Sequence, residues 1–160
     1  MTEQTETLAV RHSLSVAVPL ERAFAVFTDR IGTWWPLESR SIGAAPAVTA
    51  VLEPREGGRW YERAADGSET PWGRVLAWEP PRRLVLAWEI SRDWTHDPDE
   101  ASEVEVRFSD DGAGGTRVEL EHRRLEVYGE QAQQMRAIFG SPDGWGAILA
   151  HYAAAAGGAS

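Results

Sequence analysis

The chain has 160 residues, of which 42% are hydrophobic and 26% charged, with a formal net charge of −9 at pH 7 and no cysteine. This length fits a single domain with a sizeable core, and the acidic balance argues against nucleic-acid and anionic-membrane partners, which recruit basic patches. The lack of cysteine excludes disulfides and thiolate chemistry. Neither a signal peptide nor a membrane-length apolar run is visible, which predicts a cytoplasmic protein without membrane insertion.

The first third of the chain predicts a polar tail, one strand and two short helices. Residues 1–7 are polar, and apolar and polar side chains then alternate from Leu8 to Val18, as in a half-buried strand. Residues 20–29 have apolar side chains at helical spacing, and residues 30–36 predict a second helical turn or a tight loop that ends at a proline.

The middle of the chain predicts a run of strands. They cover residues 48–53, 59–64, 70–79, 82–91, 102–109 and 116–124. Pro80 and Pro81 join two of them and fit only a turn, because proline donates no hydrogen bond to a neighbouring strand. Since no helix separates these strands, we expect an antiparallel sheet and the α+β class.

The C-terminal part predicts two helices that cover the apolar face of the sheet. The first spans residues 128–139, and the run Ser141–Asp143, with serine, proline and an acid in order, predicts the N-terminus of the second. The second helix carries an apolar stripe at helical spacing: Trp145, Ile148, Leu149 and Tyr152. A glycine pair ends it, so we expect one domain over residues 8–156 and a short tail over 157–160.

Five segments of the chain resemble a known family. In chain order they are VPLERAFAVFTD, EPREGGRWYERAADGS, GRVLAWEPPRRLVLAWE, GTRVELEHRRLE and DGWGAILAHYAAA. Together they resemble the branch of the START/Bet v 1-like (SRPBCC) superfamily that is related to the activator of Hsp90 ATPase. The resemblance implies a helix-grip fold, in which a curved seven-stranded antiparallel sheet wraps around a long C-terminal helix. Two short helices follow the first strand, and a cavity lies between sheet and helix.

Eight tryptophans are an unusual number for this length and suggest an aromatic cavity wall. Trp34 and Trp35 are adjacent, and because successive helical residues point about 100° apart, we expect one in the core and the other over an opening. In the implied fold, the expected ligand-binding residues are Trp34, Trp35, Trp60, Trp72, Trp88, His122, Trp145, Ile148 and Tyr152. The alternative is that these rings fill the interior and leave no cavity.

His122 is the ionisable residue of greatest interest, because strand parity turns it inward beside Leu120. It can serve as a polar anchor for a ligand or move a proton, or its ring can be satisfied by a neighbouring backbone group or carboxylate. His96 lies in a polar loop and is expected to be solvated. We find no motif for a nucleophile, a metal or a cofactor.

Three functions follow from these observations. The preferred one is binding of a hydrophobic or aromatic small molecule in the cavity. The second, which rests on the resemblance alone, is interaction with Hsp90 or another ATPase. The third is an enzyme of the cyclase, dehydratase or hydrolase type that uses His122 as acid or base, although the sequence offers no independent reason to prefer it. The oligomeric state stays open, a homodimer included.

Overall fold

A computed structural model describes residues 9–37, 41–43 and 45–157. The predicted N-terminal tail over residues 1–7 lies outside the described residues, as do residues 158–160 of the predicted C-terminal tail. No helix within the described ranges is long and apolar enough to cross a membrane.

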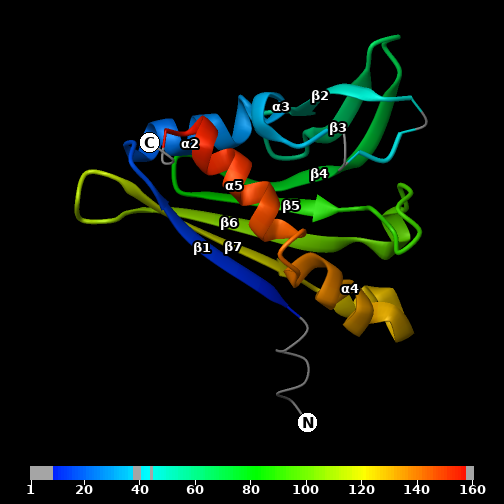
Figure 1. The fold of residues 1–160 in the computed structure, drawn as a ribbon. Helices are drawn as coiled ribbons and strands as arrows, with labels where there is room; N and C mark the ends of the chain where they lie inside the picture. Colours follow the sequence, from blue (N-terminus) through cyan, green and yellow to red (C-terminus); the bar gives the residue numbers. More distant parts are fainter. Residues whose placement is uncertain (1–8, 38–40, 44, 158–160) are drawn as a thin grey trace.

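Seven antiparallel strands form one sheet in the order β1-β7-β6-β5-β4-β3-β2 (Figure 1). The strands are β1 (Val10–Val16), β2 (Ala47–Leu52), β3 (Arg59–Ala64), β4 (Glu69–Glu79), β5 (Arg83–Trp88), β6 (Ser102–Asp110) and β7 (Thr116–Arg123). Strands β2 to β7 each pair with the next along the chain, and β1 joins the far edge of β7. The predicted antiparallel sheet and α+β class are therefore confirmed.

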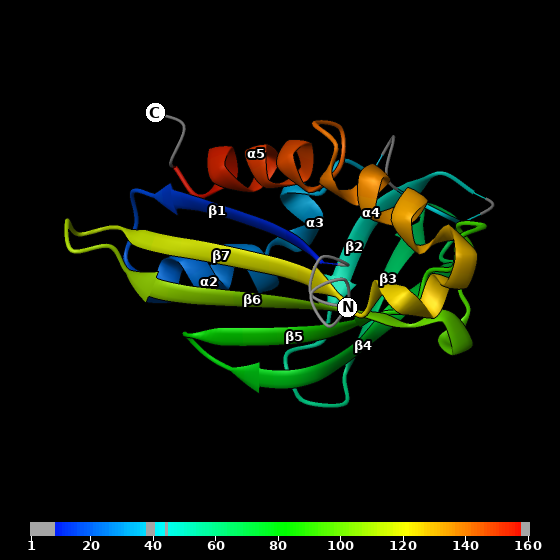
Figure 2. The same cartoon turned by 90° about the horizontal axis from the view of Figure 1, so that it is seen from below.

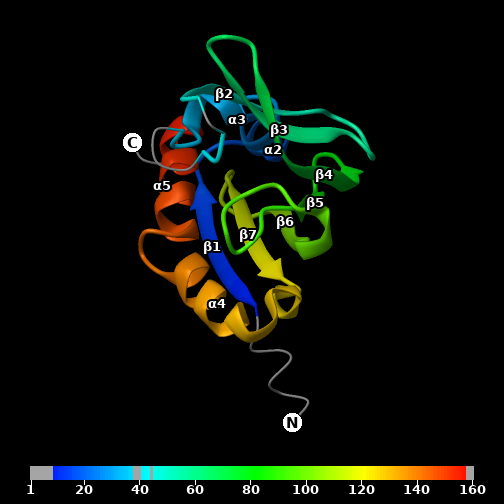
Figure 3. The same cartoon turned by 90° about the vertical axis from the view of Figure 1, so that its right-hand side faces the viewer.

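The sheet curls in the half that contains β2 to β5 (Figure 3). The register shifts once in each of the three strand pairs there, and such irregularities bend a sheet. Gly73 lies at a close approach of β4 to β5, where an added Cβ would stand 1.7 Å from the carbonyl oxygen of Ala87. Only glycine allows the two strands to meet this way.

The helices lie against one face of the sheet, as the view in Figure 2 shows with α2 behind β6 and β7. They are α2 (Leu20–Thr28), α3 (Ile31–Trp34), α4 (Ala132–Gly140) and α5 (Trp145–Ala155), with short 3-10 helices η1 (Pro98–Glu100) and η2 (Leu125–Gln131). Segments η2, α4 and α5 together make the long, bent C-terminal helical segment that grips the sheet. The helix-grip architecture is confirmed.

The C-terminal segment is more broken than the sequence pattern predicts. The single helix expected over residues 128–139 is interrupted at Gly129, whose φ of 60° and ψ of −128° are not helical. The predicted helix start at Ser141 is also wrong, because α5 has Gly144 as its N-cap. The Ser141 hydroxyl instead donates to the carbonyl oxygen of Ile138 at 2.9 Å, so it closes the turn that ends α4.

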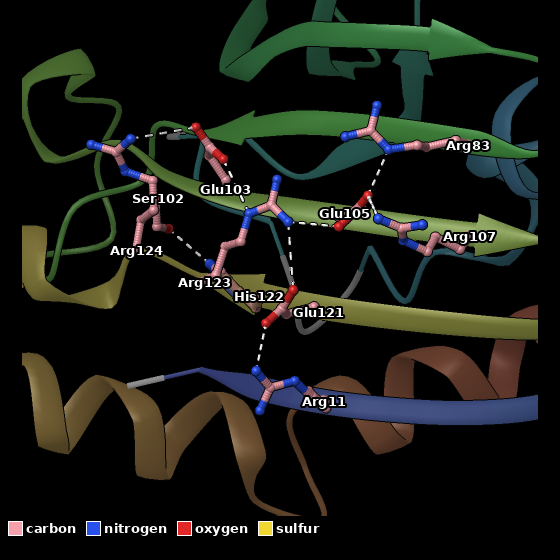
Figure 4. Close-up of polar contacts among 10 residues, drawn as sticks. All are labelled: Arg11, Arg83, Ser102, Glu103, Glu105, Arg107, Glu121, His122, Arg123 and Arg124. Atoms are coloured by element: carbon pink, nitrogen blue, oxygen red, sulfur yellow. Dashed lines mark hydrogen bonds and ion pairs between the residues drawn. The ribbon is translucent and has the colours of Figure 1, made fainter. Parts of the chain in front are cut away.

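The outer face of the sheet carries a ladder of ion pairs across β1, β7, β6 and β5 (Figure 4). Glu105 is at its centre and accepts from Arg83 and Arg123 at 2.6 Å each and from Arg107 at 2.9 Å. Glu105 faces away from the helices, yet only 4% of it is exposed, because the arginines cover it. Burial would raise the pKa of Glu105, but the hydrogen bonds from Arg83 and Arg123 outweigh it and lower that pKa.

Glu105→Gln is expected to lower the free energy of unfolding by about 1–2 kcal/mol, since it removes the carboxylate shared by Arg83, Arg107 and Arg123. Glu119→Gln is the matched control, because its side chain is 49% exposed and it should change stability by less than about 0.5 kcal/mol. Urea unfolding of both variants at neutral pH measures the difference. Equal effects of the two substitutions would contradict a central role for Glu105.

Candidate functional site

A cavity of about 360 Å³ lies between the curled sheet, the segment before β2, and the C-terminal helices. Its described walls are Trp35, Ser41, Ile42, Trp72, Trp88, Ile90, Trp94, Ile138, Phe139, Ser141, Asp143, Gly144, Trp145 and Ile148. Five of these are tryptophans and most of the rest are apolar, a composition typical of sites for hydrophobic small molecules. Asp143 is the one ionisable side chain among these described lining residues.

The structure divides the residues predicted from the sequence into two layers. Five of them line the cavity: Trp35, Trp72, Trp88, Trp145 and Ile148. The other four, Trp34, Trp60, His122 and Tyr152, are buried but are not among its described walls. All nine residues are buried. The periodicity of the strands and helices does not distinguish the residues that border the cavity from those that lie behind them.

Trp34 and Trp35 face different neighbours, yet both are buried, at 4% and 5% exposure. The Trp34 ring packs against Phe27 and Tyr152, and its indole N–H donates to the carbonyl oxygen of Val26 at 2.8 Å. Trp35 lines the cavity, so one ring packs in the core and the other borders the cavity, although neither ring is exposed.

Trp72 is held from behind by a buried carboxylate. Glu62 on β3 is 2% exposed and accepts the indole N–H of Trp72 at 2.8 Å. The same carboxylate accepts the backbone N–H groups of Ile42 and Gly43 at 2.7 and 2.9 Å. One side chain therefore fixes two parts of the cavity wall, the Trp72 ring and the segment that carries Ile42.

Trp145 is held by a chain of hydrogen bonds that ends at a backbone carbonyl. Its indole N–H donates to Nδ1 of His122 at 3.0 Å. His122 Nε2 lies 2.7 Å from the Ser102 hydroxyl, which lies 3.3 Å from the Tyr128 hydroxyl, and Tyr128 donates to the carbonyl oxygen of Ile90 at 2.9 Å. Figure 4 shows the Ser102–His122 link.

The donor and acceptor of each hydrogen bond in this series follow from its two end groups, the indole of Trp145 and the carbonyl of Ile90. An indole only donates, so Nδ1 of His122 must accept, and the proton of a neutral imidazole then sits on Nε2. Nε2 donates to Ser102, which in turn donates to Tyr128, because Tyr128 gives its own proton to a carbonyl that only accepts. Both nitrogens of His122 are thus occupied within the protein.

Burial keeps His122 neutral. The residue has no exposed surface, and this desolvation lowers the pKa of its imidazole to about 3. Its ring centroid lies 4.3 Å from that of Phe139 and 5.0 Å from that of Trp88. Burial likewise raises the pKa of the Tyr128 hydroxyl to about 12. Neither His122 nor Tyr128 therefore changes its protonation state near neutral pH. We assign His122 a positioning role for Trp145.

These anchors determine what the cavity presents to a ligand. The indole N–H groups of Trp72 and Trp145 are both used by protein acceptors, so these two walls offer ring faces and edges. The N–H groups of Trp60 and Trp88 make no hydrogen bond with the described parts of the chain, although the Trp88 N–H lies near enough to Tyr128 to lower the pKa of its hydroxyl. The Trp72 and Trp145 walls therefore present apolar ring surface, with no indole N–H left for another acceptor.

Several wall residues were not predicted from the sequence, and neither was Glu62 behind them. Ile42 and Trp94 lie in irregular segments, where periodicity gives no face, whereas Phe139 lies inside α4, within the helix expected over residues 128–139, and was not assigned to the cavity. Glu62 did leave a signal, because it has the inward parity of Trp60 on the same strand, and a carboxylate at an inward position needs buried donors.

The sequence suggested that His96 is solvated, but the structure gives its side chain a carboxylate partner. Its Nε2 lies 2.8 Å from Glu89 Oε1, and Glu89 also pairs with Arg74 at 3.0 Å. These contacts hold the loop after β5 against the sheet. In the described ranges, no three histidine or carboxylate side chains gather as a metal-binding group.

Comparisons with known proteins agree with this geometry. The model of the Activator of Hsp90 ATPase homolog 1-like protein family matches residues 17–157. Among solved structures, the anthrahydroquino-γ-pyrone synthase Txn09, solved as a complex, is 42% identical with a TM-score of 0.63, over 92% of this chain and 96% of its own. No match to a curated protein was found.

Two further solved structures are similar over almost the whole chain. CalC from Micromonospora echinospora, described as a self-sacrificing resistance protein, is 30% identical with a TM-score of 0.65, over 92% of this chain and 93% of its own. Protein NE0264 from Nitrosomonas europaea has a TM-score of 0.65 at 15% identity, over 94% and 95% of the two chains, and shows the fold alone.

Proposed function

This chain belongs to the Activator of Hsp90 ATPase homolog 1-like family, and from that premise we propose that it binds a flat, polycyclic aromatic molecule of the anthrahydroquinone class in the tryptophan-lined cavity. The observation that carries the proposal is the state of the cavity walls. Trp72 and Trp145 are locked from behind by Glu62 and His122, so their rings are fixed before any ligand arrives. Fixed aromatic rings favour a rigid planar ligand, because little side-chain entropy is lost on binding.

The class of ligand is suggested by the similarity to Txn09, whose name describes an anthrahydroquinone fused to a γ-pyrone. Fused aromatic rings stack on indole faces and edges, and their apolar area suits a wall with few polar groups. Ser41, Ser141 and Asp143 supply the polar part of the described wall, and Asp143 is exposed to solvent. A ligand with hydroxyl groups on one edge would place that edge toward these residues.

A second candidate is ring closure on the bound ligand, which the 42% identity to a synthase favours. In such a reaction a phenolic oxygen adds to a ketone carbon, its proton passes to the carbonyl oxygen, and loss of water then gives the pyrone. His122 is poorly suited to move that proton, because both of its nitrogens are engaged and its pKa lies about 3. Asp143 is the lining group with suitable chemistry.

Titration with 1,8-dihydroxyanthraquinone tests the binding proposal. We expect saturable quenching of tryptophan fluorescence with a Kd on the order of 10–100 μM, the range typical for a small ligand without dedicated polar contacts. Ile148→Phe enlarges a cavity wall residue and should weaken binding about tenfold or more. Palmitate, an aliphatic probe, should compete weakly or not at all. Quenching that does not saturate, or that Ile148→Phe leaves unchanged, would remove the proposal.

A further inference from the structure

Trp94 is unusual in two independent respects. Its φ is 62°, and among the described residues the one other non-glycine residue with positive φ is Arg124. It is also 41% exposed, although a tryptophan normally buries most of its ring. A bulky residue in the left-handed region is destabilising unless its surroundings hold it there.

Ser91 accepts several of the hydrogen bonds that fix the loop carrying Trp94. The Ser91 carbonyl accepts the Trp94 N–H at 2.9 Å, and the Ser91 hydroxyl oxygen accepts the backbone N–H of Asp93 at 3.1 Å and that of Thr95 at 3.4 Å. An isolated bridge between Ile90 and His96 closes the loop. The backbone around Trp94 is thus set by contacts that do not involve its ring.

The exposed ring lies at the cavity. Trp94 lines it and meets Phe139 edge-on, with ring centroids 6.2 Å apart. Three large hydrophobic residues are exposed among those described, Val48, Trp94 and Ile138, and the last two both line the cavity. Exposed apolar surface is therefore gathered where the cavity meets solvent, and such surface marks a binding site.

We propose that Trp94 is the outer stacking residue of the ligand site: a planar ligand extends beyond the buried part of the cavity, and its outer ring is covered by Trp94 together with Ile138. This inference rests on the proposed function, because it names where the same aromatic ligand ends. It also explains why a strained backbone holds an indole in solvent, since the ring gains its contacts when the ligand is bound.

The pair Trp94→Gly and Arg124→Gly tests the proposal, because both replace a residue at positive φ by the one that adopts it freely. Both substitutions relieve backbone strain, but Trp94→Gly also removes the ring contact with Phe139, so we expect each variant to melt within about 4 °C of the wild type. Isothermal titration with 1,8-dihydroxyanthraquinone should show about tenfold weaker binding for Trp94→Gly and a change of less than twofold for Arg124→Gly. Trp94→Phe, which keeps an aromatic ring, should lie between Trp94→Gly and the wild type.

The outcomes separate this inference from the proposed function. Without saturable binding to the wild type, the proposed function fails and this inference fails with it. If the wild type binds and Trp94→Gly binds equally well, Trp94 does not contact the ligand, while the proposed function stands. If Trp94→Gly binds weakly and melts much more than about 4 °C below the wild type, the indole is needed for the fold itself, and the inference is overturned.

Discussion

Glu62→Ala is expected to lower the free energy of unfolding by about 3 kcal/mol, because it leaves the buried indole N–H of Trp72 without an acceptor. The backbone N–H groups of Ile42 and Gly43 lose their acceptor in the same step. Urea or thermal unfolding measures the loss.

Glu69→Ala is the matched control for this substitution. Glu69 lies on the neighbouring strand, and its partly exposed side chain forms ion pairs with Arg59 and Arg63. Its removal should change stability by less than about 1 kcal/mol. Glu62→Ala should also weaken binding of an aromatic ligand, since Trp72 and the segment at Ile42 lose their shared anchor. Equal stability of the two variants would contradict the role assigned to Glu62.

The second large effect is a loss of stability in weak acid caused by His122. Its pKa is about 3 in the folded protein and near its ordinary value of 6.5 in the unfolded chain. Below pH 6.5 the unfolded state therefore takes up a proton that the folded state does not, and stability falls by about 1.4 kcal/mol per pH unit. Between pH 7 and pH 5 this single group should remove about 2 kcal/mol.

His122→Gln isolates this contribution, because glutamine does not titrate while the other histidines stay in place. The variant should be less stable at pH 8, where it loses the bond to Trp145, but its stability should fall about 2 kcal/mol less than that of the wild type between pH 7 and pH 5. Histidine NMR signals provide a second measure that needs no variant. A His122 resonance that titrates near pH 6.5 in the folded protein would contradict its assignment as a buried neutral group.

The sequence predicted the sheet well, because alternation identifies both the strand and its faces. The strand expected over residues 116–124 is β7, and its parity correctly placed Leu120 and His122 in the interior. The tryptophans were expected in the interior because of their unusual number and because of the fold that the resemblance implied. The antiparallel order followed from strands that succeed each other without helices between them.

The sequence pattern could not predict which of the buried residues border the cavity. Trp60 and Trp72 share one interior, yet one lies behind the wall and the other in it, since the curl of the sheet depends on register shifts that periodicity does not encode. The exposed Trp94 depends on a loop closed by Ser91. The helix start predicted at Ser141 was wrong because the Ser141 hydroxyl donates to the carbonyl oxygen of Ile138 and closes a turn, so it does not cap α5.

The central claim is that the cavity holds a planar polycyclic aromatic ligand, and a crystal structure of the protein with 1,8-dihydroxyanthraquinone tests it most directly. We predict electron density for the ligand inside the cavity, in contact with the Trp88 and Trp145 rings, with its outer ring against Trp94 and its hydroxylated edge toward Asp143. A cavity that contains only ordered water while the ligand binds elsewhere on the protein would contradict the account.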